Sequence, residues 1–370
     1  MKVGVLTSSR ADFGIYLPLL KLLKKDSFFN LEIIVFGTHL SKKHGETITE
    51  IEQYQFCKIH KIKTTPNSDS AKDISNSIGG TISKFSEFWS KNKYDLVFCL
   101  GDRYEMFAAV SSATTFNLKF AHIHAGETTL GAIDNGYRHS ISLFSDFLFV
   151  STEKYKHRAI NLVNGSAKVY NVGALSIDNL HNTELFSKEE FLKEYEIDMN
   201  IPTILSTFHP ETVNFHKNEI YIDELLSAFN VLLNAYQIVI TLPNADTMGE
   251  LIRNKIIKYQ QKNKKLIVIE SFGMKGYLSC MKYSRLLLGN SSSGFVEALF
   301  FSKPVVNLGN RQKGRIVTEN ILNIKIIKSE IIKTINAIES IGVYVKNNIY
   351  GDGDSSKKII KIIKENHGNY

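Results

Sequence analysis

Short apolar runs alternate along this chain with longer stretches in which apolar residues recur every three or four positions. The short runs are typical of buried strands in a parallel sheet, and the longer stretches are typical of amphipathic helices. The predicted strands are residues 3–7, 31–36, 96–100, 119–122, 146–150, 167–172, 203–206, 237–241, 266–269, 285–288 and 305–308. This alternation predicts an α/β protein with doubly wound parallel sheets.

The predicted helices lie between these strands. They are residues 45–54, 71–91, 104–116, 135–144, 219–234 and a helix that begins near residue 295. A first helix follows residue 14, and a last one at residues 356–365 interleaves isoleucines with lysines. We expect the last helix to pack on the body of the protein, because its apolar face is small for the alternative, a helix on a membrane surface.

The chain has 370 residues, which is too long for one ordinary core and suits two domains. The strand–helix pattern restarts in the second half, so we place the domain boundary near Gly173. The strand-end loops of two such domains would face one another, and we expect the ligand to bind in a cleft between them.

Composition and charge limit the kinds of molecule and compartment that we expect for this protein. The net charge is +8, but the lysines are scattered, so we expect no nucleic-acid binding and a positive field that attracts an anionic nucleotide sugar. No apolar run is long enough to span a bilayer, and the run at residues 3–6 is too short for a signal peptide. Three cysteines far apart indicate a reducing compartment, and we expect a cytoplasmic protein that contacts no membrane.

Polar residues follow two predicted strands of the first half. Arg10 lies in the loop after the first strand, where a phosphate contact is our interpretation and a salt bridge to Asp12 is the alternative. No G-x-G-x-x-G fingerprint is present. Asp102 and Arg103 follow the strand at residues 96–100; a simple ion pair is possible in principle, but the strand end favours a substrate role.

The densest group of titratable residues lies between residues 120 and 139. This stretch carries His122, His124, Glu127, Asp134, Arg138 and His139 around a glycine-rich turn. So many titratable residues in one stretch indicate a catalytic site. The alternative is a hydrogen-bonded loop with incidental charges. A second alternative is a metal site, because an H-x-H step can place two imidazoles on one side of a strand.

The second half contains a candidate phosphate site at residues 289–294, which read GNSSSG. Small residues let the backbone approach a diphosphate, and amides at a helix N-terminus supply positive potential. A serine helix cap is the alternative. Glu297 could accept hydrogen bonds from ribose hydroxyls, Arg311 and Arg315 could reach phosphate or pair with Glu319, and Asn244 follows the strand at residues 237–241.

Six motifs in this order resemble the hydrolysing UDP-N-acetylglucosamine 2-epimerases of the sialic-acid and legionaminic-acid pathways. They are SSRADFG (8–14), GDR (101–103), HIHAGE with GAIDNGYRH (122–139), FHP (208–210), GNSSSG (289–294) and NLGNRQKGR (307–315). The resemblance covers nearly the whole chain.

This resemblance implies a GT-B fold with two Rossmann-like domains, at residues 1–172 and 173–350, and a final segment, residues 351–370, that packs back on the first domain. It implies release of UDP and a free manno-configured sugar, with no cofactor, no metal, and a homodimer or homotetramer. It also implies roles for the site residues. Asp102 and Arg103 would contact the sugar, and Glu127, Asp134 and Arg138 would surround its reacting carbons. The nucleotide would be bound by Arg10, Arg311, His209, Ser291 and Ser292 at the phosphates, Phe272 at uracil and Glu297 at ribose.

Two departures from the family pattern concern the substrate. Sialic-acid members carry glutamate where this chain has His124, and Ala125 replaces the first glycine of their H-I-x-G-G-E pattern. The loop at residues 128–133 is one residue longer. The HIH form resembles members that act on GlcNAc nucleotides and members that act on diacetylbacillosamine nucleotides, so the substituents at C4 and C6 stay open.

The reaction implied by this resemblance needs proton transfer at C2 of the sugar. Glu127 and Asp134 are the leading candidates, with Asp102 third, and neighbouring carboxylates would push their pKa values apart. How protons divide among these acids and His124 stays open. Competing functions are a non-hydrolysing 2-epimerase, a GT-B glycosyltransferase and a non-catalytic nucleotide-sugar sensor; the retained acids argue against the last.

Overall fold

The computed structural model describes residues 1–42, 45–66, 68–213, 215–243, 247–338 and 348–367. The chain forms two compact units. Unit 1 comprises Met1–Glu127, Asp134–Asn182 and Ile349–Tyr370, and unit 2 comprises Thr128–Ile133 and Thr183–Asn348. In the described residues, no helix is both long enough and apolar enough to cross a membrane.

Unit 1 is built on a seven-stranded parallel sheet in the order β3-β2-β1-β4-β5-β6-β7. Its strands are β1 (Lys2–Thr7), β2 (Asn30–Phe36), β3 (Lys58–Ile62), β4 (Leu96–Leu100), β5 (Phe120–Ile123), β6 (Phe147–Val150) and β7 (Lys168–Asn171). Every position of β4, β5 and β6 is buried, as expected for central strands that helices cover on both faces.

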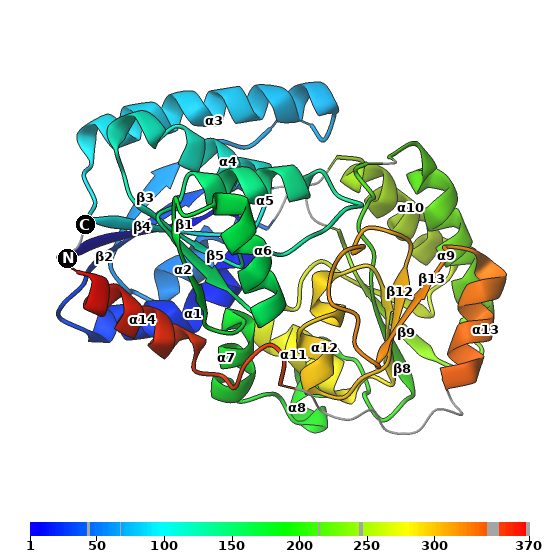
Figure 1. Ribbon diagram of the computed structural model, residues 1–370. Coiled ribbons are helices and arrows are strands. Elements are labelled where there is room, and N and C mark those ends of the chain that lie inside the picture. The colour runs from blue at the N-terminus through cyan, green and yellow to red at the C-terminus, as the bar shows by residue number, and fades with distance from the viewer. Residues whose placement is uncertain (43–44, 67, 214, 244–246, 339–347, 368–370) are drawn as a thin grey trace. The chain divides into compact units, whose positions relative to one another are not determined.

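The helices of unit 1 follow its strands (Figure 1). They are α1 (Arg10–Lys25), α2 (Ile48–Gln53), α3 (Ala71–Lys91), α4 (Tyr104–Ser111), α5 (Asp134–Leu143), α6 (Glu153–Val163), α7 (Leu175–Asn182) and α14 (Ser355–Asn366). The long helix α3 turns Phe85 and Trp89 into a core that also contains Leu6 and Phe36 of the sheet. Its exposed positions are mostly polar, which is the amphipathic pattern of a surface helix.

The strand order reverses between β1 and β4, which lie side by side although two strands separate them in the sequence. In open α/β sheets, ligands bind outside the carboxyl ends of the strands at such a switch point. The loops that leave β1 and β4 begin at Ser8 and Gly101. The predicted site residue Asp102 therefore lies in the loop after β4, and Arg10 is the first residue of the helix that follows the loop after β1.

Unit 2 has a six-stranded parallel sheet in the order β10-β9-β8-β11-β12-β13, with its switch point between β8 and β11. The strands are β8 (Thr203–Thr207), β9 (Gln237–Thr241), β10 (Leu266–Ile269), β11 (Leu286–Gly289), β12 (Val305–Leu308) and β13 (Ile321–Ile324). The helices are α8 (Lys188–Tyr195), α9 (Asn218–Leu232), α10 (Gly249–Lys262), α11 (Gly273–Tyr283), α12 (Glu297–Phe300) and α13 (Lys328–Ile338).

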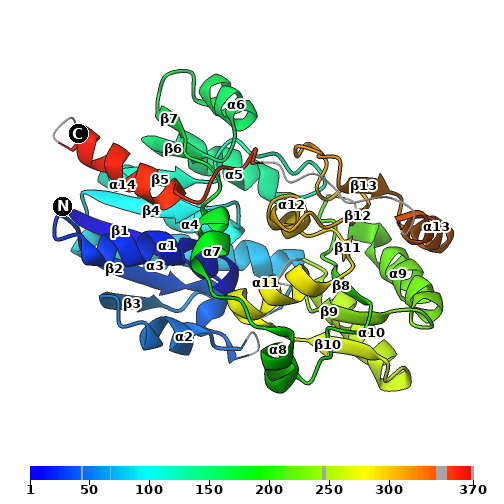
Figure 2. The ribbon, with the colours of Figure 1, turned by 90° about the horizontal axis from the view of Figure 1, so that it is seen from below.

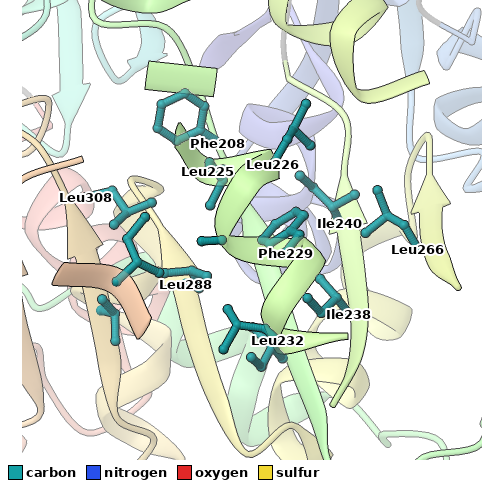
Figure 3. Packing of buried hydrophobic residues seen from close by; sticks show 14 of the residues in the cluster. Phe208, Leu225, Leu226, Phe229, Leu232, Ile238, Ile240, Leu266, Leu288 and Leu308 are labelled. Carbon is teal, nitrogen blue, oxygen red and sulfur yellow. The ribbon is translucent and has the colours of Figure 1, made fainter. Parts of the chain in front are cut away.

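The core of unit 2 is distinct from that of unit 1. Figure 3 shows Phe208 and Phe229 among leucine and isoleucine side chains of α9 and of the strands. Phe229 and Leu225 come from the buried face of α9, and Ile238 and Ile240 come from β9. The predicted pair of parallel α/β sheets is confirmed by these two units.

The boundary between the units differs from the one expected near Gly173. Helix α7 packs against α1 and α14, so it belongs to unit 1 and the chain passes into unit 2 at Thr183. The carbonyl of Tyr350 accepts a hydrogen bond of 2.7 Å from the Ala174 amide, which joins the C-terminal segment to the start of α7. Figure 2 shows α14 beside α1 from a second direction.

The start of α14 is held by a side chain from another helix. The carboxylate of Asp178, which is fully buried in α7, accepts hydrogen bonds from the amides of Ser355 (2.9 Å) and Ser356 (2.7 Å) and from the Ser356 hydroxyl. A helix leaves its first amides without internal partners, and here an acid 177 residues earlier in the chain supplies them.

Three local expectations were wrong or incomplete. The predicted helix at residues 104–116 ends at Ser111, and a separate 3₁₀ turn covers Thr114–Phe116. Hydroxyls of Ser112 and Thr114 bond to carbonyls three residues earlier, which competes with the regular helix. The edge strands β3 and β13 were not predicted, because polar and half-exposed residues interrupt their apolar pattern.

Candidate active site

The chain turns sharply after β5, and this turn shapes the candidate active site of unit 1. The strand ends at Ile123, and His124 (φ 64°) and Gly126 (φ 73°) both adopt the left-handed conformation. A methyl group on Gly126 would lie 2.4 Å from the carbonyl oxygen of Tyr155, so only glycine fits there. The turn leaves the side chain of Glu127 with only 1% of its surface exposed.

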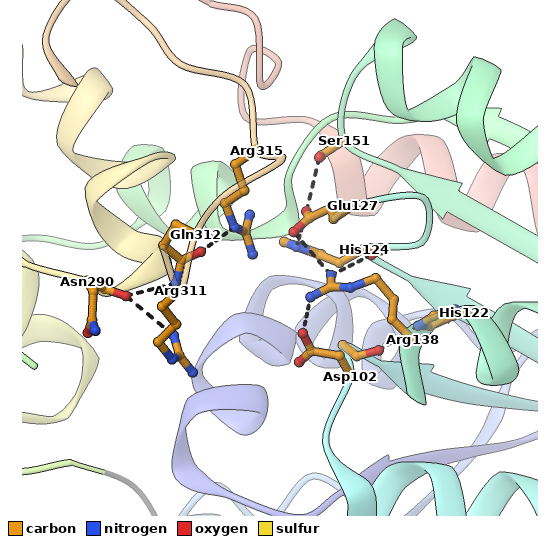
Figure 4. Close-up of polar contacts among 11 residues, drawn as sticks. Asp102, His122, His124, Glu127, Arg138, Ser151, Asn290, Arg311, Gln312 and Arg315 are labelled. Carbon is orange, nitrogen blue, oxygen red and sulfur yellow. Dashed lines mark hydrogen bonds and ion pairs between the residues drawn. The ribbon is translucent and has the colours of Figure 1, made fainter. Parts of the chain in front are cut away.

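Arg138 is the centre of the site (Figure 4). It lies one turn into α5 and is 2% exposed. Its Nη1 donates to Glu127 Oε2 (3.2 Å) and to the carbonyl oxygen of His124 (3.1 Å), and its Nη2 donates to Asp102. Glu127, Asp134 and Asp102 were expected to cluster as like charges. Between Asp102 and Glu127, the guanidinium of Arg138 contacts both carboxylates and offsets their repulsion.

His124 and Glu127 form a hydrogen-bonded pair. The Nδ1 atom of His124 lies 3.0 Å from Glu127 Oε1, which also accepts from the Ser151 hydroxyl at 3.3 Å. The buried Nε2 atom of His124 has no hydrogen-bond partner among the described residues. An imidazole held at one nitrogen and unoccupied at the other is arranged to exchange a proton with a bound molecule.

His122 serves the structure of the site. Its ring is fully buried, Nε2 lies 2.8 Å from the Gly101 carbonyl oxygen and Nδ1 lies 2.9 Å from the Ser142 hydroxyl. Burial and the nearby Arg138 lower its pKa to about 3, against the opposing hydrogen bond to Gly101, so the ring stays neutral. It fixes the loop that carries Asp102.

The alternative of a metal site is not supported by this geometry. The H-x-H step requires a strand that continues through His124, but β5 ends one residue earlier and His124 is left-handed. Both nitrogens of His122 already contact protein groups. Within the described part of the chain, no group of three or more histidine, cysteine or acidic side chains could hold a metal ion.

Asp134 and His139 lie on α5 with Arg138. Asp134 is the first residue of that helix and is half-buried, and its charge helps to raise the pKa of Tyr137, after the larger effect of burial. Burial, with Arg138 and Arg158, lowers the pKa of His139. A carboxylate in the first turn of a helix is stabilised by the helix dipole.

The loop after β1 is held by an acid. The two carboxylate oxygens of Asp12 accept hydrogen bonds from the amides of Ser8 and Ser9, each at 2.7 Å, and from both hydroxyls. This capping box begins α1 at Arg10 and fixes the loop that directly precedes that arginine. Asp12, which lies in the first turn of α1, therefore stabilises the loop after β1.

Arg103 is engaged with a neighbour. Its Nε and Nη2 donate to the carboxylate oxygens of the fully buried Glu105, at 3.2 and 3.0 Å. The alternative of an ion pair at this strand end thus applies to Arg103, with Glu105 rather than Asp102 as its partner, while Asp102 pairs with Arg138. The role of Arg103 toward a sugar stays a prediction.

In unit 2, the loops at the switch point are joined by Asn290. This side chain is fully buried and bonds to the backbone of His209 in both directions, Nδ2 to the carbonyl oxygen at 2.8 Å and Oδ1 to the amide at 2.7 Å. His209 is 7% exposed. The loop after β8 is thereby fixed to the loop after β11.

A third loop, after β12, joins the same framework (Figure 4). The Asn290 carbonyl oxygen accepts hydrogen bonds from Gln312 Nε2 (2.8 Å) and from Arg311 Nη1 (3.4 Å). Arg315 donates from Nε to Gln312 Oε1 at 2.7 Å. The Asn290 carbonyl oxygen thus orients Arg311 directly and Arg315 through the Gln312 side chain.

The serine-rich turn differs from its expected form. Residues Ser292–Gly294 form a 3₁₀ turn, and the helix after it, α12, has only four residues. A helix that short supplies little dipole, so any anion binding here depends on hydroxyls and backbone amides. The Ser293 hydroxyl lies 2.6 Å from that of Tyr277 and 3.0 Å from that of Ser291, while Ser292 is exposed.

The predicted nucleotide contacts of Phe272 and Glu297 stay untested, although the structure shows the surroundings of both side chains. Phe272 is 6% exposed and packs against Phe191 and Tyr195, whose hydroxyl donates to the Phe272 carbonyl oxygen at 3.0 Å. Its ring therefore belongs to the packing of unit 2, and its contact with uracil stays a prediction. Glu297 is half-buried, and its charge adds to the effects that raise the pKa of Tyr277, of which burial is the largest. Asn244 lies outside the described residues.

Sequence reasoning missed the residues that hold this framework together. Ser151, Asn290 and Gln312 each form hydrogen bonds that position a predicted residue, which is Glu127, His209 and Arg315 in turn. Glu211, fully buried, accepts from the Asn310 amide. Ser151 and Glu211 each lie within five residues of the end of a predicted strand, which is the signal that could have identified them.

The chain is similar to a known family over nearly its whole length. The family model described as UDP-N-acetylglucosamine 2-epimerase matches residues 21–364. The polysialic acid biosynthesis protein P7 of Escherichia coli is 36% identical over 335 residues, which are 90% of this chain and 85% of that protein. The GDP/UDP-N,N'-diacetylbacillosamine 2-epimerase (hydrolyzing) of Campylobacter jejuni is 36% identical over 326 residues, 88% of this chain and 84% of the relative.

Solved structures agree with the fold. The UDP-GlcNAc 2-epimerase of Neisseria meningitidis bound to UDP-GlcNAc aligns over 99% of this chain and 100% of that chain, with a TM-score of 0.81 and 20% identity. The Methanocaldococcus jannaschii UDP-GlcNAc 2-epimerase in complex with UDP-GlcNAc and UDP also gives a TM-score of 0.81, at 19% identity, over 99% and 100% of the two chains. The two parallel-sheet units thus have the GT-B-like fold of these proteins.

Proposed function

Because this chain belongs to the UDP-N-acetylglucosamine 2-epimerase family, we propose that it is a hydrolysing UDP-N-acetylglucosamine 2-epimerase. It converts UDP-GlcNAc and water into N-acetylmannosamine and UDP, a product suited to the biosynthesis of sialic-acid-type sugars. The observation that carries this proposal is the cluster in which Arg138 joins Asp102 to Glu127 and Glu127 contacts His124.

The reaction has two steps. A base removes the proton from C2, the C–H electron pair forms the C1–C2 double bond, and the C1–O bond breaks to release UDP. Water then adds its oxygen to C1 of the glycal, and C2 receives a proton on the opposite face. Inversion at C2 therefore needs two proton-transfer groups on different sides of the ring, as well as positive groups at the leaving diphosphate.

The cluster in unit 1 can supply the proton transfers. Glu127 is oriented by donors on both carboxylate oxygens, and its partner His124 has an unoccupied Nε2. Proton transfer through the His124–Glu127 pair is our assignment for one face of C2. Asp134, or Asp102 as the third candidate, serves the other face. Arg138 holds the pair and Asp102 in position and offsets their charge.

The loops of unit 2 can supply the charge stabilisation. Arg311, His209 and the hydroxyls of Ser291 and Ser292 surround the framework built on Asn290, and we assign them to the diphosphate together with Arg10 of unit 1. Glu297 is assigned to the ribose hydroxyls. Donors held in place before the reaction cost little reorganisation when negative charge develops on the leaving group.

The sugar itself has two candidates. Relatives at 36% identity include a protein named for polysialic acid biosynthesis and one named for GDP/UDP-diacetylbacillosamine. A relative named UDP-N-acetylglucosamine 2-epimerase, from Neisseria meningitidis, is 28% identical over 356 residues. The alternative substrate is therefore a UDP- or GDP-linked 2,4-diacetamido-2,4,6-trideoxy sugar, which would undergo the same reaction.

An NMR time course tests the proposal. The purified protein is incubated with UDP-GlcNAc in deuterated water, without added metal or acceptor. We expect UDP and N-acetylmannosamine deuterated at C2, since the proton removed by the base exchanges with solvent. If UDP-GlcNAc is inert, the same experiment with the diacetamido nucleotide sugar decides for the alternative.

Other outcomes would contradict the proposal. Formation of UDP-N-acetylmannosamine, with the nucleotide retained, would show a non-hydrolysing epimerase. UDP release only on addition of an acceptor would show a glycosyltransferase. Binding without turnover of either sugar would show a sensor. The expected homodimer or homotetramer and the cytoplasmic location remain predictions, and light scattering on the purified protein tests the first.

A further inference from the structure

We propose that Thr128–Ile133 is a positioning segment that couples nucleotide binding in unit 2 to the placement of Glu127 and Asp134, and that Gly131 and Thr212 are the residues that hold it. The inference rests on the proposed function for the identity of the ligand. It extends that function, because it assigns a task to residues that contact neither the reacting carbons nor the diphosphate.

The course of the chain is the first observation. The chain leaves unit 1 after Glu127, contributes Thr128–Ile133 to unit 2, and returns to unit 1 at Asp134. The two acids assigned to proton transfer are therefore the residues directly before and after this segment. A shift of the segment within unit 2 pulls on the backbone of both.

The segment is fixed in unit 2 by backbone hydrogen bonds. The Leu130 amide donates to the Lys313 carbonyl oxygen at 2.8 Å, and the Ile133 amide donates to the Thr212 hydroxyl at 2.9 Å. Thr129 and Ala132 are each 4% exposed. The segment thus lies against two loops, the one after β8 and the one after β12.

At Gly131 the backbone of the segment lies very close to the backbone of residues 310 and 311. A methyl group there would lie 2.3 Å from the Asn310 carbonyl oxygen and 2.6 Å from the Arg311 Cα atom. Gly131 is not among the residues with positive φ, so its conformation suits alanine and only the space does not. The lack of a side chain is what allows two backbones to meet next to Arg311, a proposed phosphate contact.

The loop at residues 310–314 is itself held by hydrogen bonds to other parts of unit 2. Glu211, two residues after His209, accepts from the Asn310 amide, and Gln312 donates to the Asn290 carbonyl oxygen at 2.8 Å. Asn290 also holds both backbone groups of His209. The surface that seats the segment and the residues assigned to phosphate are therefore one hydrogen-bonded framework.

This framework gives the coupling a physical route. A diphosphate bound to Arg311 and His209 further restrains the backbone of Asn310 and of Lys313, which contact Gly131 and Leu130. The segment then moves less, and Glu127 and Asp134 are held more closely in the positions that the reaction needs. Binding energy from the non-reacting nucleotide is thus used at the reacting carbons.

Kinetics of the substitution Gly131→Ala test the inference. Because 310–314 is anchored by two side chains, we expect the added methyl group to displace the segment rather than the loop. The expected result is a kcat at least tenfold lower, with the Kd of UDP changed by less than about threefold. Thr212→Val, which removes only the hydroxyl acceptor, should lower kcat in the same direction. Gly80→Ala is the matched control, because a methyl group there meets nothing within 4 Å.

Amide hydrogen exchange tests the coupling without turnover. In the wild-type protein, saturating UDP should slow exchange in peptides that contain Leu130 and Ile133 as well as in those that cover residues 309–315. In Gly131→Ala, UDP should still protect the peptides that cover residues 309–315. The peptides that contain Leu130 and Ile133 should lose at least half of their protection. This measurement also applies if Gly131→Ala is too unstable for kinetics, because Thr212→Val can replace it.

The outcomes separate the two proposals. UDP protection of residues 309–315 with unchanged exchange at residues 128–133 in the wild-type protein would overturn the coupling, whatever the enzyme turns over. A fall in UDP affinity that matches the fall in kcat/KM, with kcat unchanged, would also overturn it. UDP-induced protection of both regions without turnover of either sugar would support the coupling and contradict the proposed reaction.

Discussion

Single side chains at the carboxyl ends of the strands have unequal tasks, although they look alike in the sequence. His122 and His124 are two residues apart, yet the first has both nitrogens occupied and a pKa near 3, and the second keeps Nε2 unoccupied among the described residues. The function of an ionisable group depends on whether its neighbours already occupy its hydrogen-bonding atoms and on how they shift its pKa. Of these two histidines, His124 is the one placed for proton exchange.

Replacement of either acid at the ends of the positioning segment should stop the chemistry. Glu127→Gln and Asp134→Asn should each lower kcat by about a hundredfold or more, because an amide cannot exchange the proton. Circular dichroism and the Kd of UDP should stay close to wild type. Glu189→Gln is the control, since Glu189 is exposed in the first turn of α8. Near-wild-type rates for both variants would contradict the assignment.

Acid should destabilise the protein through a buried histidine remote from the cluster. His39 is fully buried between the hydroxyls of Thr7 and Thr47, and burial lowers its pKa to about 4 against the opposing charge of Asp12. The unfolded chain binds a proton at this residue below about pH 6.5, and the folded protein does not until about pH 4. Stability is therefore present above pH 6.5 and is lost as the pH falls through this window.

Urea unfolding at two pH values measures this contribution. Between pH 6.5 and pH 5, protonation of His39 in the unfolded chain should remove about 2 kcal/mol from the free energy of unfolding. His39→Gln, which does not titrate, should show a smaller loss over the same interval. An equal loss in both proteins would assign the acid sensitivity to other groups, of which the buried His122 is the first to examine.

At the scale of elements, the parts that could be predicted are those with a continuous apolar pattern. The strand expected at residues 237–241 matches β9, and the helix expected at residues 71–91 matches α3. Parallel strands meet at one edge of a sheet, so the sequence alone sufficed to place Asp102 near the 120–139 stretch.

The remainder could not be predicted, for physical reasons. An amide such as Asn290 or Gln312 belongs to a buried framework only through partners far away in the sequence, and no periodicity marks it. The capture of Thr128–Ile133 by unit 2 depends on the space beside Asn310. The passage of the chain from unit 1 into unit 2 after Asn182 depends on the packing of α7 against α1 and α14, and local propensity carries no such information.

Helix α14 provides a prediction at this scale. Its isoleucines alternate between buried and half-buried positions, with Ile359 and Ile363 fully buried. Ile363→Ala should lower the free energy of unfolding of unit 1 by about 2–5 kcal/mol, since it leaves a cavity. Ile362→Ala is the matched control, because Ile362 is only half-buried and should cost distinctly less. Equal losses would show that α14 does not pack as described.

At the scale of the whole molecule, two separate cores imply two unfolding events. The core around Phe229 belongs to unit 2, and the core around Phe85 and Trp89 belongs to unit 1. Multidomain proteins commonly depart from a single two-state transition. Calorimetry of Asp178→Asn, which weakens the hold on α14, should therefore shift one component downward and leave the other in place. A uniform shift of the entire transition would indicate one cooperative unit.

The late position of α14 has a consequence for the making of the protein. Residues 349–370 complete unit 1, although the 166 residues of Thr183–Asn348 are synthesised before them. At about 5–20 residues per second, that interval lasts roughly 10 to 30 seconds. During translation, unit 2 can fold on the ribosome while α1 and α7 still expose the surface that Ile359 and Ile363 will cover. A nascent chain in this state is a natural client for a chaperone.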